Sequence, residues 1–534
     1  MTIRFSSSRR ILLFSSLLLP CLSSLVFAQG TVQSAIPQAA TKNETEHVVM
    51  MVWDGLRPDS VSAQNTPNLF RLAQSGVTFS RHHPVYPSST EVNGAALATG
   101  SYPEHSGVIA NKEFRPDIDP LQAIATEDLE AVRKGDAKTP YLLAPTLAEI
   151  IQASGSPTAI AGTKPVALLG DRLDKRTSPA ARASSTVFEG QALSPASLEA
   201  IVKAQGVFPP TIEFPNTKED AWTTRALTQT LWKGGVPKFS QLWLSDVDYT
   251  QHDSAPGSPA ALAALKSCDN QLAAVLAALD AQGVRSKTAI FVVSDHGFST
   301  ISRQVDVYAA LKEAGFKAPK KFAAPPQNGE VMVVGLGGSA LFYVGGHDRI
   351  VTQRLAQFLQ TTNFAGVLWS RDALQGTFPL ALAKMNSAGA PDLVMSFRWD
   401  SAANRFGVPG SILSEGKRIA GQGSHASLSA FDMHNTCIAA GPDFKTGFID
   451  TTPSGNVDLA PTILHLLGLN SPSAMDGRVL GESLRNSLTL PSVQSGKLES
   501  TSKFNGQNRS QYLLWQSVDG VVYFDEGNSG APAP

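Results

Sequence analysis

Mainly apolar runs alternate along this chain with amphipathic segments that are bounded by glycine and proline. The runs HVVMMVW (47–53), FSQLWLS (239–245) and TAIFVVS (288–294) have the composition of strands that are buried on both faces of a sheet. Between such runs the pattern predicts helices at 66–75, 90–99, 259–280 and 456–466. The segments VTFSRHH, DLVMSF and TCIAAG are predicted as further strands.

Buried strands that alternate with helices predict an α/β fold, with a central, mostly parallel sheet covered by helices on both faces. No internal repeat divides the chain, so we expect one large catalytic domain. The boundaries that we predict are an N-terminal arm at 29–46, the domain at 47–485 with a loop-rich insertion at about 115–235, and a C-terminal extension at 486–534. The extension should hold an edge hairpin followed by a disordered end.

The first 28 residues have the layout of a secretory signal peptide. Three arginines precede a mostly apolar stretch at 11–19, and residues 26–28 have small side chains where cleavage requires them. We expect cleavage after Ala28 and a periplasmic or secreted protein. An uncleaved anchor is the alternative, as is a lipoprotein that uses Cys21, which Pro20 disfavours.

Charge and composition exclude some classes of function. The 44 basic residues are matched by 45 acidic ones, and aromatic residues make up only 7% of the chain, so neither a nucleic-acid surface nor a base-stacking platform is indicated. No later apolar run is long enough to span a bilayer. Cys268 and Cys437 lie in apolar segments, and we expect both to be buried free thiols.

Aspartate and histidine gather where the predicted strands end. The carboxyl ends of parallel strands meet at one edge of a sheet, which is where functional groups collect. Mixed carboxylate and imidazole sets suit zinc. We therefore predict two zinc ions, the first held by Asp54, Asp295 and His296 and the second by Asp248, His252 and His425. The remaining histidines lack such neighbours and are expected at the surface or in hydrogen bonds: His47, His82, His83, His105, His347, His434 and His465.

A hydroxyl group at the start of the helix predicted at 90–99 is the candidate nucleophile. Free backbone N–H groups and the helix dipole favour an anion at that position. Thr90 is the first residue of this helix, and Ser88 and Ser89 directly precede it. Composition alone leaves all three open, and an N-cap role for Thr90 is the structural alternative.

Several segments together resemble motifs of the alkaline phosphatase superfamily, and most closely those of its nucleotide pyrophosphatase/phosphodiesterase branch. They are VWDGLRPD, YPSSTEVN, TGSYPEHSGVIANKEF, DVDYTQH, VVSDHGF, GSHASLSAFDMHNTCIAAGPDFKTG and SGNVDLAPTILHLLGL. The resemblance runs from about residue 47 to 485. It implies an alkaline phosphatase-like fold and hydrolysis of small phosphate esters through a phosphothreonine intermediate.

The resemblance also implies a role for individual residues. Thr90 matches the family's nucleophile and contacts the zinc ion of Asp54, Asp295 and His296, whereas Asp248, His252 and His425 match the ligands of the other zinc ion. Asn111 matches a contact to a phosphate oxygen. Lys164 matches a phosphate-contacting lysine of phosphonoacetate hydrolases and some bacterial phosphatases.

Departures from the family pattern concern the substrate. Asn93-Gly94 stands where the family usually has Asn-His, Gln251 replaces a typical glycine, and Val166 replaces the arginine of the phosphatases. A phosphodiester or nucleotide pyrophosphate is therefore the first expectation, ahead of a phosphomonoester and then a phosphonate. Outside enzymes, the alternative is a secreted binding protein on a decayed scaffold.

Overall fold

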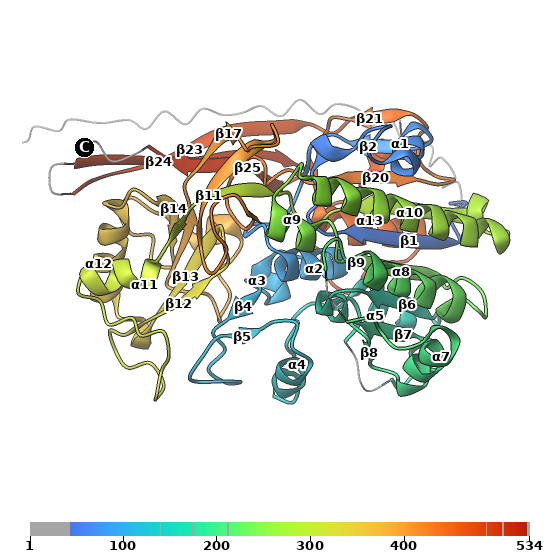
Figure 1. The fold of residues 1–534 in the computed structure, drawn as a ribbon, viewed down its shortest axis with the longest axis horizontal. Helices are drawn as coiled ribbons and strands as arrows, with labels where there is room; N and C mark the ends of the chain where they lie inside the picture. Colours follow the sequence, from blue (N-terminus) through green and yellow to red (C-terminus); the bar gives the residue numbers. More distant parts are fainter. Residues whose placement is uncertain are drawn as a thin grey trace, which may run out of the picture. The chain divides into compact units, whose positions relative to one another are not determined.

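The largest sheet has nine strands, and β1 lies at its middle (Figure 1). Strands β10, β1, β9, β6 and β7 run parallel, whereas β20 pairs antiparallel with β10 and with β2. The order across the sheet is β21 (Phe448–Asp450), β2 (Val77–Phe79), β20 (Cys437–Ala440), β10 (Thr288–Val293), β1 (His47–Trp53), β9 (Phe239–Leu244), β6 (Thr158–Gly162), β7 (Ser185–Phe188) and β8 (Gln191–Ala192). The predicted α/β class with a mostly parallel sheet is confirmed.

Helices cover both faces of this sheet. Side chains of β1 alternate between two cores, since Val48, Met50 and Val52 pack on one face and Val49, Met51 and Trp53 on the other. The first face is covered by α2 (Thr90–Thr99), α5 (Leu147–Ala153) and α13 (Leu459–Leu466), and the second by α1 (Pro67–Gln74) and α10 (Pro259–Ala281). Burial on both faces explains why this strand is apolar throughout.

In the part of the chain that the structure describes, three further sheets have three or more strands. A five-stranded sheet packs against α11 (Val307–Glu313) and α12 (Arg349–Gln360). Its order is β12 (Val331–Gly335), β13 (Ser339–Val344), β16 (Leu393–Phe397), β14 (Ala365–Ser370) and β15 (Phe378–Pro379). A four-stranded sheet has the order β17 (Trp399–Ala403), β18 (Pro409–Glu415), β11 (Ser299–Val305) and β19 (Gly423–Ser424). The C-terminal sheet consists of β23 (Val493–Phe504), β24 (Gln507–Val518) and β25 (Val521–Ser529).

Shorter elements connect these layers. The remaining strands are β3 (His82–His83), which pairs with β22 (Ser454–Gly455), and β4 (Lys112–Glu113), which pairs with β5 (Ile124–Ala125). The remaining α-helices are α3 (Pro103–Ser106), α4 (Leu129–Asp136), α6 (Pro179–Ala183), α7 (Pro195–Gln205), α8 (Thr217–Arg225) and α9 (Asp248–Ser254). A π-helix, η3 (Ala226–Leu231), continues α8, and the 3₁₀ turns include η2 (Pro165–Gly170) and η7 (Asn456–Asp458).

The structure differs from the predicted organisation in three details. VTFSRHH forms two short strands in different sheets, because β2 joins the nine-stranded sheet and β3 pairs with β22. DLVMSF forms a strand, as predicted, and supplies β16 of the five-stranded sheet. The region 115–235, predicted as a loop-rich insertion, contributes β6, β7 and β8 to the nine-stranded sheet. The predicted edge hairpin is part of a three-stranded sheet, and β25 continues to Ser529, into the end predicted as disordered.

The computed structural model describes residues 43–138, 140–172, 176–210, 213–487, 489–504 and 507–530. From Asn43 onward they form one compact unit. The predicted signal peptide and residues 29–42 of the predicted arm lie outside the described residues. Within the described ranges, no helix combines the length and the apolar character needed to cross a bilayer. Cys268 and Cys437 are buried free thiols, as predicted.

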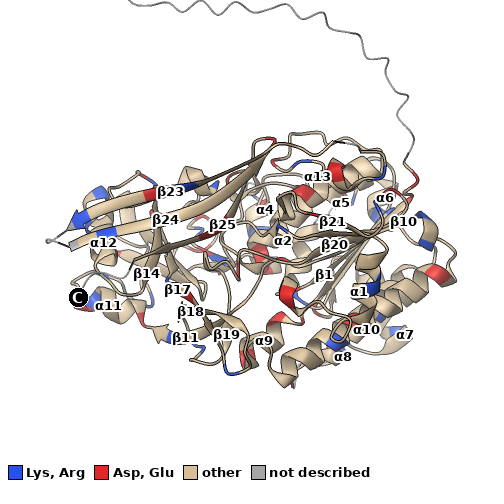
Figure 2. Cartoon of the chain, turned by 90° about the horizontal axis from the view of Figure 1, so that it is seen from above, with Lys and Arg blue, Asp and Glu red and all other residues tan. Residues whose placement is uncertain are grey.

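Basic and acidic residues are interspersed over the elements (Figure 2). This mixture agrees with the near balance of 44 basic and 45 acidic residues in the sequence.

Candidate active site and metal centre

The carboxyl ends of β1, β9 and β10 bring four of the predicted ligands together. These strands are neighbours in the sheet and run parallel, so the residues that follow them meet at one edge. Asp54 follows β1, Asp295 and His296 follow β10, and Asp248 begins α9 after β9. Gly55, with a φ of +70°, allows a tight turn, because a Cβ atom there would lie 3.2 Å from Asp248 Cα.

Asp54, Asp295 and His296 form one compact group. His296 Nε2 lies 3.2 Å from Asp295 Oδ2 and 3.6 Å from Asp54 Oδ1. The other ring nitrogen, Nδ1, lies 2.9 Å from the carbonyl oxygen of Gly297, which fixes the orientation of the ring. All three side chains are fully buried.

Asp248, His252 and His425 form the second group. The Nε2 atoms of His252 and His425 lie 3.2 and 3.5 Å from Asp248 Oδ1, and their Nδ1 atoms face the carbonyl oxygens of Gly423 and Ser88, each at 2.9 Å. The ring of His425 stacks on that of His296 at 3.6 Å, so the two groups adjoin. His252 comes from α9, and His425 directly follows β19.

The hydrogen bonding of these groups fits divalent metal ions. Asp54 Oδ1, Asp248 Oδ1 and Asp295 Oδ2 are buried and accept no hydrogen bond, although each faces an imidazole Nε2. A neutral ring whose Nδ1–H binds a carbonyl oxygen turns an Nε2 lone pair toward the carboxylate. Ligands about 2.0–2.1 Å from a tetrahedral zinc ion lie about 3.3 Å apart, which is close to the observed separations.

Burial sets the charge of several groups in this site. It lowers the pKa of His252 and His425, which favours the neutral imidazole that binds metals. Burial also raises the pKa of Asp54 above its usual range and that of Asp295 to about 7. Neighbouring carboxylates, Asp295 around Asp54 and Asp248 around both, add to this effect. The site therefore holds closely spaced anionic groups that a cation would stabilise.

Thr90 lies at the start of α2, beside the first group. Its Oγ1 is 3.2 Å from His296 Nε2, and the residue lines the cavity over the site. Ser88 donates its hydroxyl to the carbonyl oxygen of Ser427 at 2.8 Å. Neither Ser88 nor Ser89 lines that cavity. Among the three hydroxyl groups that the sequence left open, the structure brings that of Thr90 to the predicted ligands.

Lys164 lies between the two ligand groups. It precedes η2, is 6% exposed, and its Nζ lies 2.9 Å from both Asp54 Oδ2 and Asp248 Oδ2. The ammonium group also lies 4.7 Å from the centre of the Tyr249 ring. Although burial alone would lower it, the carboxylates of Asp248 and Asp54 hold the pKa of Lys164 above its usual range. Lys164 thus neutralises one carboxylate of each group.

Asn111 and several residues that sequence reasoning missed complete the site. Asn111 Oδ1 accepts a hydrogen bond from the backbone N–H of Glu91 at 3.3 Å, so it lies at the start of α2. Trp243 Nε1 donates to Asp54 Oδ2 at 2.8 Å. The side-chain amide of Asn456 donates to the carbonyl oxygen of Asp295 at 2.8 Å. Trp243 lies in the apolar strand that precedes Asp248, so the sequence offers a signal for it. No residue spacing in the sequence points to Asn456.

A cavity of about 310 Å³ opens over Thr90. Besides the residues above, its lining contains three basic and three acidic side chains: Lys112, Lys417, Arg418, Glu91, Glu127 and Glu415. Glu91 follows Thr90 directly, is buried, and has an oxygen without a hydrogen-bond partner. A cavity of this size is at the lower end of the range for small-molecule sites.

The fold and this site define an α/β protein in which buried carboxylate and imidazole groups lie beside the buried start of a helix that carries a hydroxyl group. Residues 48–405 match the family model described as type I phosphodiesterase/nucleotide pyrophosphatase. The chain belongs to this family, as the sequence motifs indicated.

Individual relatives agree with this assignment. Ectonucleotide pyrophosphatase/phosphodiesterase family member 3 of Bos taurus is 20% identical over 493 residues, which cover 88% of this chain and 47% of the relative. A Caenorhabditis elegans ectonucleotide pyrophosphatase/phosphodiesterase is 32% identical over 101 residues, 19% of this chain and 13% of the relative. The chain thus spans less than half the length of these curated relatives.

Solved structures show the same fold. Murine ectonucleotide pyrophosphatase/phosphodiesterase 5 superposes with a TM-score of 0.59 at 17% identity, covering 82% of this chain and all of that chain. An inactive threonine-to-alanine variant of the murine protein, solved in complex with AMP, superposes with a TM-score of 0.57 at 17% identity. It covers 80% of this chain and 96% of that chain.

Proposed function

We propose that this protein hydrolyses phosphodiester or nucleotide pyrophosphate bonds with two zinc ions and Thr90 as the nucleophile. The observation that carries the proposal is the position of Thr90 Oγ1, 3.2 Å from His296 Nε2 and beside carboxylate oxygens that lack hydrogen-bond donors. Family membership supports the reaction class.

Asp54, Asp295 and His296, together with Thr90, would hold one zinc ion, and Asp248, His252 and His425 the other. When bound, such ions supply Lewis acidity that lowers the pKa of a hydroxyl group and neutralises charge on a leaving oxygen. The choice of zinc rests on the mixed aspartate and histidine donor set. Trp243 and Lys164 orient Asp54 through its second oxygen.

Thr90 would attack phosphorus in line with the leaving group, so that the Oγ–P bond forms as the bond to the leaving oxygen breaks. Because Thr90 stands at the start of α2, the phosphoryl oxygens would lie near the backbone N–H groups of the first helical turn. The Asn111 amide would bind an equatorial oxygen from the cavity wall. Water then cleaves the phosphothreonine and regenerates the hydroxyl group.

The leaving group would occupy the cavity beside Tyr249 and the 414–418 segment. The AMP complex of the murine relative supports a nucleotide as the substrate class. A phosphomonoester is the second candidate, because Lys164 adds a buried cation that favours a dianion. Diesters rank ahead of monoesters because Val166 stands where the phosphatases have an arginine, which would be a second cation beside Lys164.

The test compares variants of zinc-loaded protein on bis-4-nitrophenyl phosphate. Thr90→Ala should lower kcat by about 10³-fold or more, because it removes the nucleophile, and Thr90→Ser should retain part of the activity. Ser88→Ala is the matched control, since its hydroxyl group faces the Ser427 carbonyl oxygen. An acid-quenched reaction should leave phosphate on Thr90. Full activity of Thr90→Ala, or label on Ser89, would refute the assignment.

A further inference from the structure

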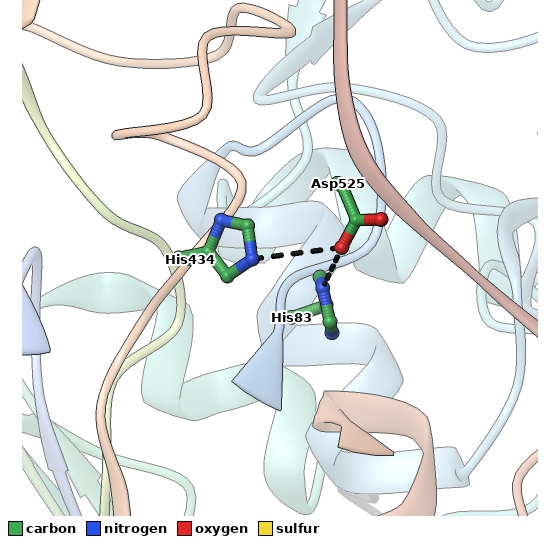
Figure 3. A group of neighbouring side chains, drawn as sticks. All are labelled: His83, His434 and Asp525. Atoms are coloured by element: carbon green, nitrogen blue, oxygen red, sulfur yellow. Dashed lines mark hydrogen bonds and ion pairs between the residues drawn. The ribbon is translucent and has the colours of Figure 1, made fainter. Parts of the chain in front are cut away.

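Three side chains outside the active site converge on one another. They are His83 in β3, His434 in the turn before β20, and Asp525 in β25 (Figure 3). Asp525 Oδ1 lies 3.0 Å from His83 Nε2 and 3.6 Å from His434 Nε2, and all three atoms lie within 4.8 Å of one another. Sequence reasoning placed both histidines among those without metal-binding neighbours.

Both histidines have an acceptor at each ring nitrogen. His83 Nδ1 lies 3.0 Å from the carbonyl oxygen of Ser454, and His434 Nδ1 lies 2.9 Å from that of Ala430. Since a neutral imidazole carries one N–H, each neutral ring turns one lone pair toward an acceptor. When each N–H is on Nδ1 and faces the backbone carbonyl oxygen, the Nε2 lone pairs of both rings point at the same carboxylate oxygen, Asp525 Oδ1.

Two lone pairs that face a carboxylate oxygen need a positive partner. This partner is either a second proton on each ring or a metal ion between the three side chains. His83 is fully buried, and the centre of its ring is only 4.6 Å from that of His434. Two imidazolium groups at such a distance would repel each other strongly, which disfavours double protonation. The same pattern, Nδ1 on a backbone carbonyl and Nε2 on a carboxylate, occurs at His296, His252 and His425.

The separations agree with a shared ion. Two ligands of a tetrahedral zinc ion lie about 3.3 Å apart, and the two Nε2–Oδ1 distances of 3.0 and 3.6 Å lie on either side of that value. Gln516 Nε2 donates to both oxygens of Asp525, at 2.7 and 2.8 Å, and so fixes the carboxylate. His434 is 31% exposed, which leaves room for water as a fourth ligand.

We infer that His83, His434 and Asp525 bind a zinc ion that fastens β25 to the β3 strand and to the turn before β20. The role of this zinc ion is structural, because neither Thr90 nor the side chains around Thr90 are among the ligands of the ion. Asp525 lies beyond residue 405, where the family match ends. The inference is independent of the proposed function.

The first test counts zinc in the full chain after dialysis against a weak chelator. Wild type should retain about one zinc ion per chain more than His434→Gln and Asp525→Asn do. Both variants should keep the kcat of wild type on the diester and show a lower midpoint of thermal unfolding. His105→Gln is the matched control. His105 Nδ1 also lies 2.9 Å from a carboxylate, that of Asp476, but its side chain is 61% exposed, and it belongs to no group of three potential ligands among the residues that the structure describes.

The second test needs no variant. Crystals of the wild type grown with zinc should give an anomalous difference peak, at the zinc absorption edge, between the two imidazoles and Asp525. Equal zinc content in wild type and variants, or no peak at this position while the active-site peaks are present, would overturn the inference and identify a protonated ion-pair cluster. Variants that fail to fold leave the anomalous peak of the wild type to decide.

Discussion

At the scale of single residues, Lys164 has two tasks that can be separated. It contacts Asp54 and Asp248, one carboxylate of each ligand group, and it also lines the cavity. The contacts of Lys164 with the two carboxylates are observed, whereas its contact with phosphate is a prediction from the resemblance. An experiment must therefore measure the two roles separately.

Lys164→Ala should lower kcat/KM for 4-nitrophenyl phosphate more than for the bis-ester, because the lost cation interacts more strongly with a dianion. The difference should be about 1–3 kcal/mol. Lys112→Ala is the control, since Lys112 lines the same cavity but is exposed and has no contact with the ligand carboxylates. Equal losses for both substrates would limit Lys164 to orienting the carboxylates. A wild-type preference for the monoester would reverse the ranking of substrates.

Glu113 is a buried carboxyl group whose protonation should affect stability. Burial raises its pKa to about 7, against the hydrogen bonds that it accepts from the backbone N–H groups of Ile109 and Ala110. A pKa that is raised on folding means that the folded protein is more stable when Glu113 is protonated. This contribution to the unfolding free energy is fully present below about pH 4.5 and is lost as the pH rises through about 7. The change amounts to about 3 kcal/mol.

Glu113→Gln should therefore flatten the fall in unfolding free energy between pH 5 and pH 8, as measured by urea titration at both values. Glu199→Gln, at an exposed position on α7, should leave the pH profile of wild type unchanged. An unaltered slope in Glu113→Gln would mean that the carboxyl group titrates normally in the folded protein.

At the scale of elements, α10 supports the strands that carry the ligands. Leu272 is fully buried in the core that contains Met51 and Trp53 of β1. Leu272→Ala should lower the unfolding free energy by about 2–5 kcal/mol, because it removes buried methyl groups and leaves a cavity. Leu262→Ala, on the same helix but 42% exposed, should cost clearly less. Similar urea midpoints for the two variants would contradict this view of the core.

The elements differ in how far the sequence predicts them. Helix 90–99 was predicted at its observed bounds, because prolines and serines precede it and Gly100 ends it with a φ of +65°. Strand β6 was missed, since TAIAG is short and rich in alanine and glycine, and burial between neighbouring strands determines its structure. The candidate metal ligands could be predicted because aspartate and histidine gather where the predicted strands end. The convergence of His83, His434 and Asp525 depends on tertiary packing, which no local pattern contains.

At the scale of the whole molecule, activity should depend on divalent metal. Treatment with a strong chelator should abolish diester hydrolysis and lower the thermal midpoint, because the buried carboxylates of both groups lose their counter-charge. Addition of zinc should restore both. In His425→Ala, zinc should be lost mainly from the group with Asp248 and His252, as measured by metal analysis. Full activity in metal-free protein would refute the zinc mechanism.

The residues of the active site come from segments that are far apart in the chain, from Asp54 to His425, and Asp525 follows later still. During translation Asp54 and Thr90 leave the ribosome early, well before the histidines that complete the two groups. A nascent chain that has not reached His425 lacks one of the proposed ligands of the second metal ion and also the ring that stacks on His296. Under the proposed mechanism, hydrolytic activity arises only after most of the polypeptide has been synthesised, and a chain that ends before His425 is expected to be inactive.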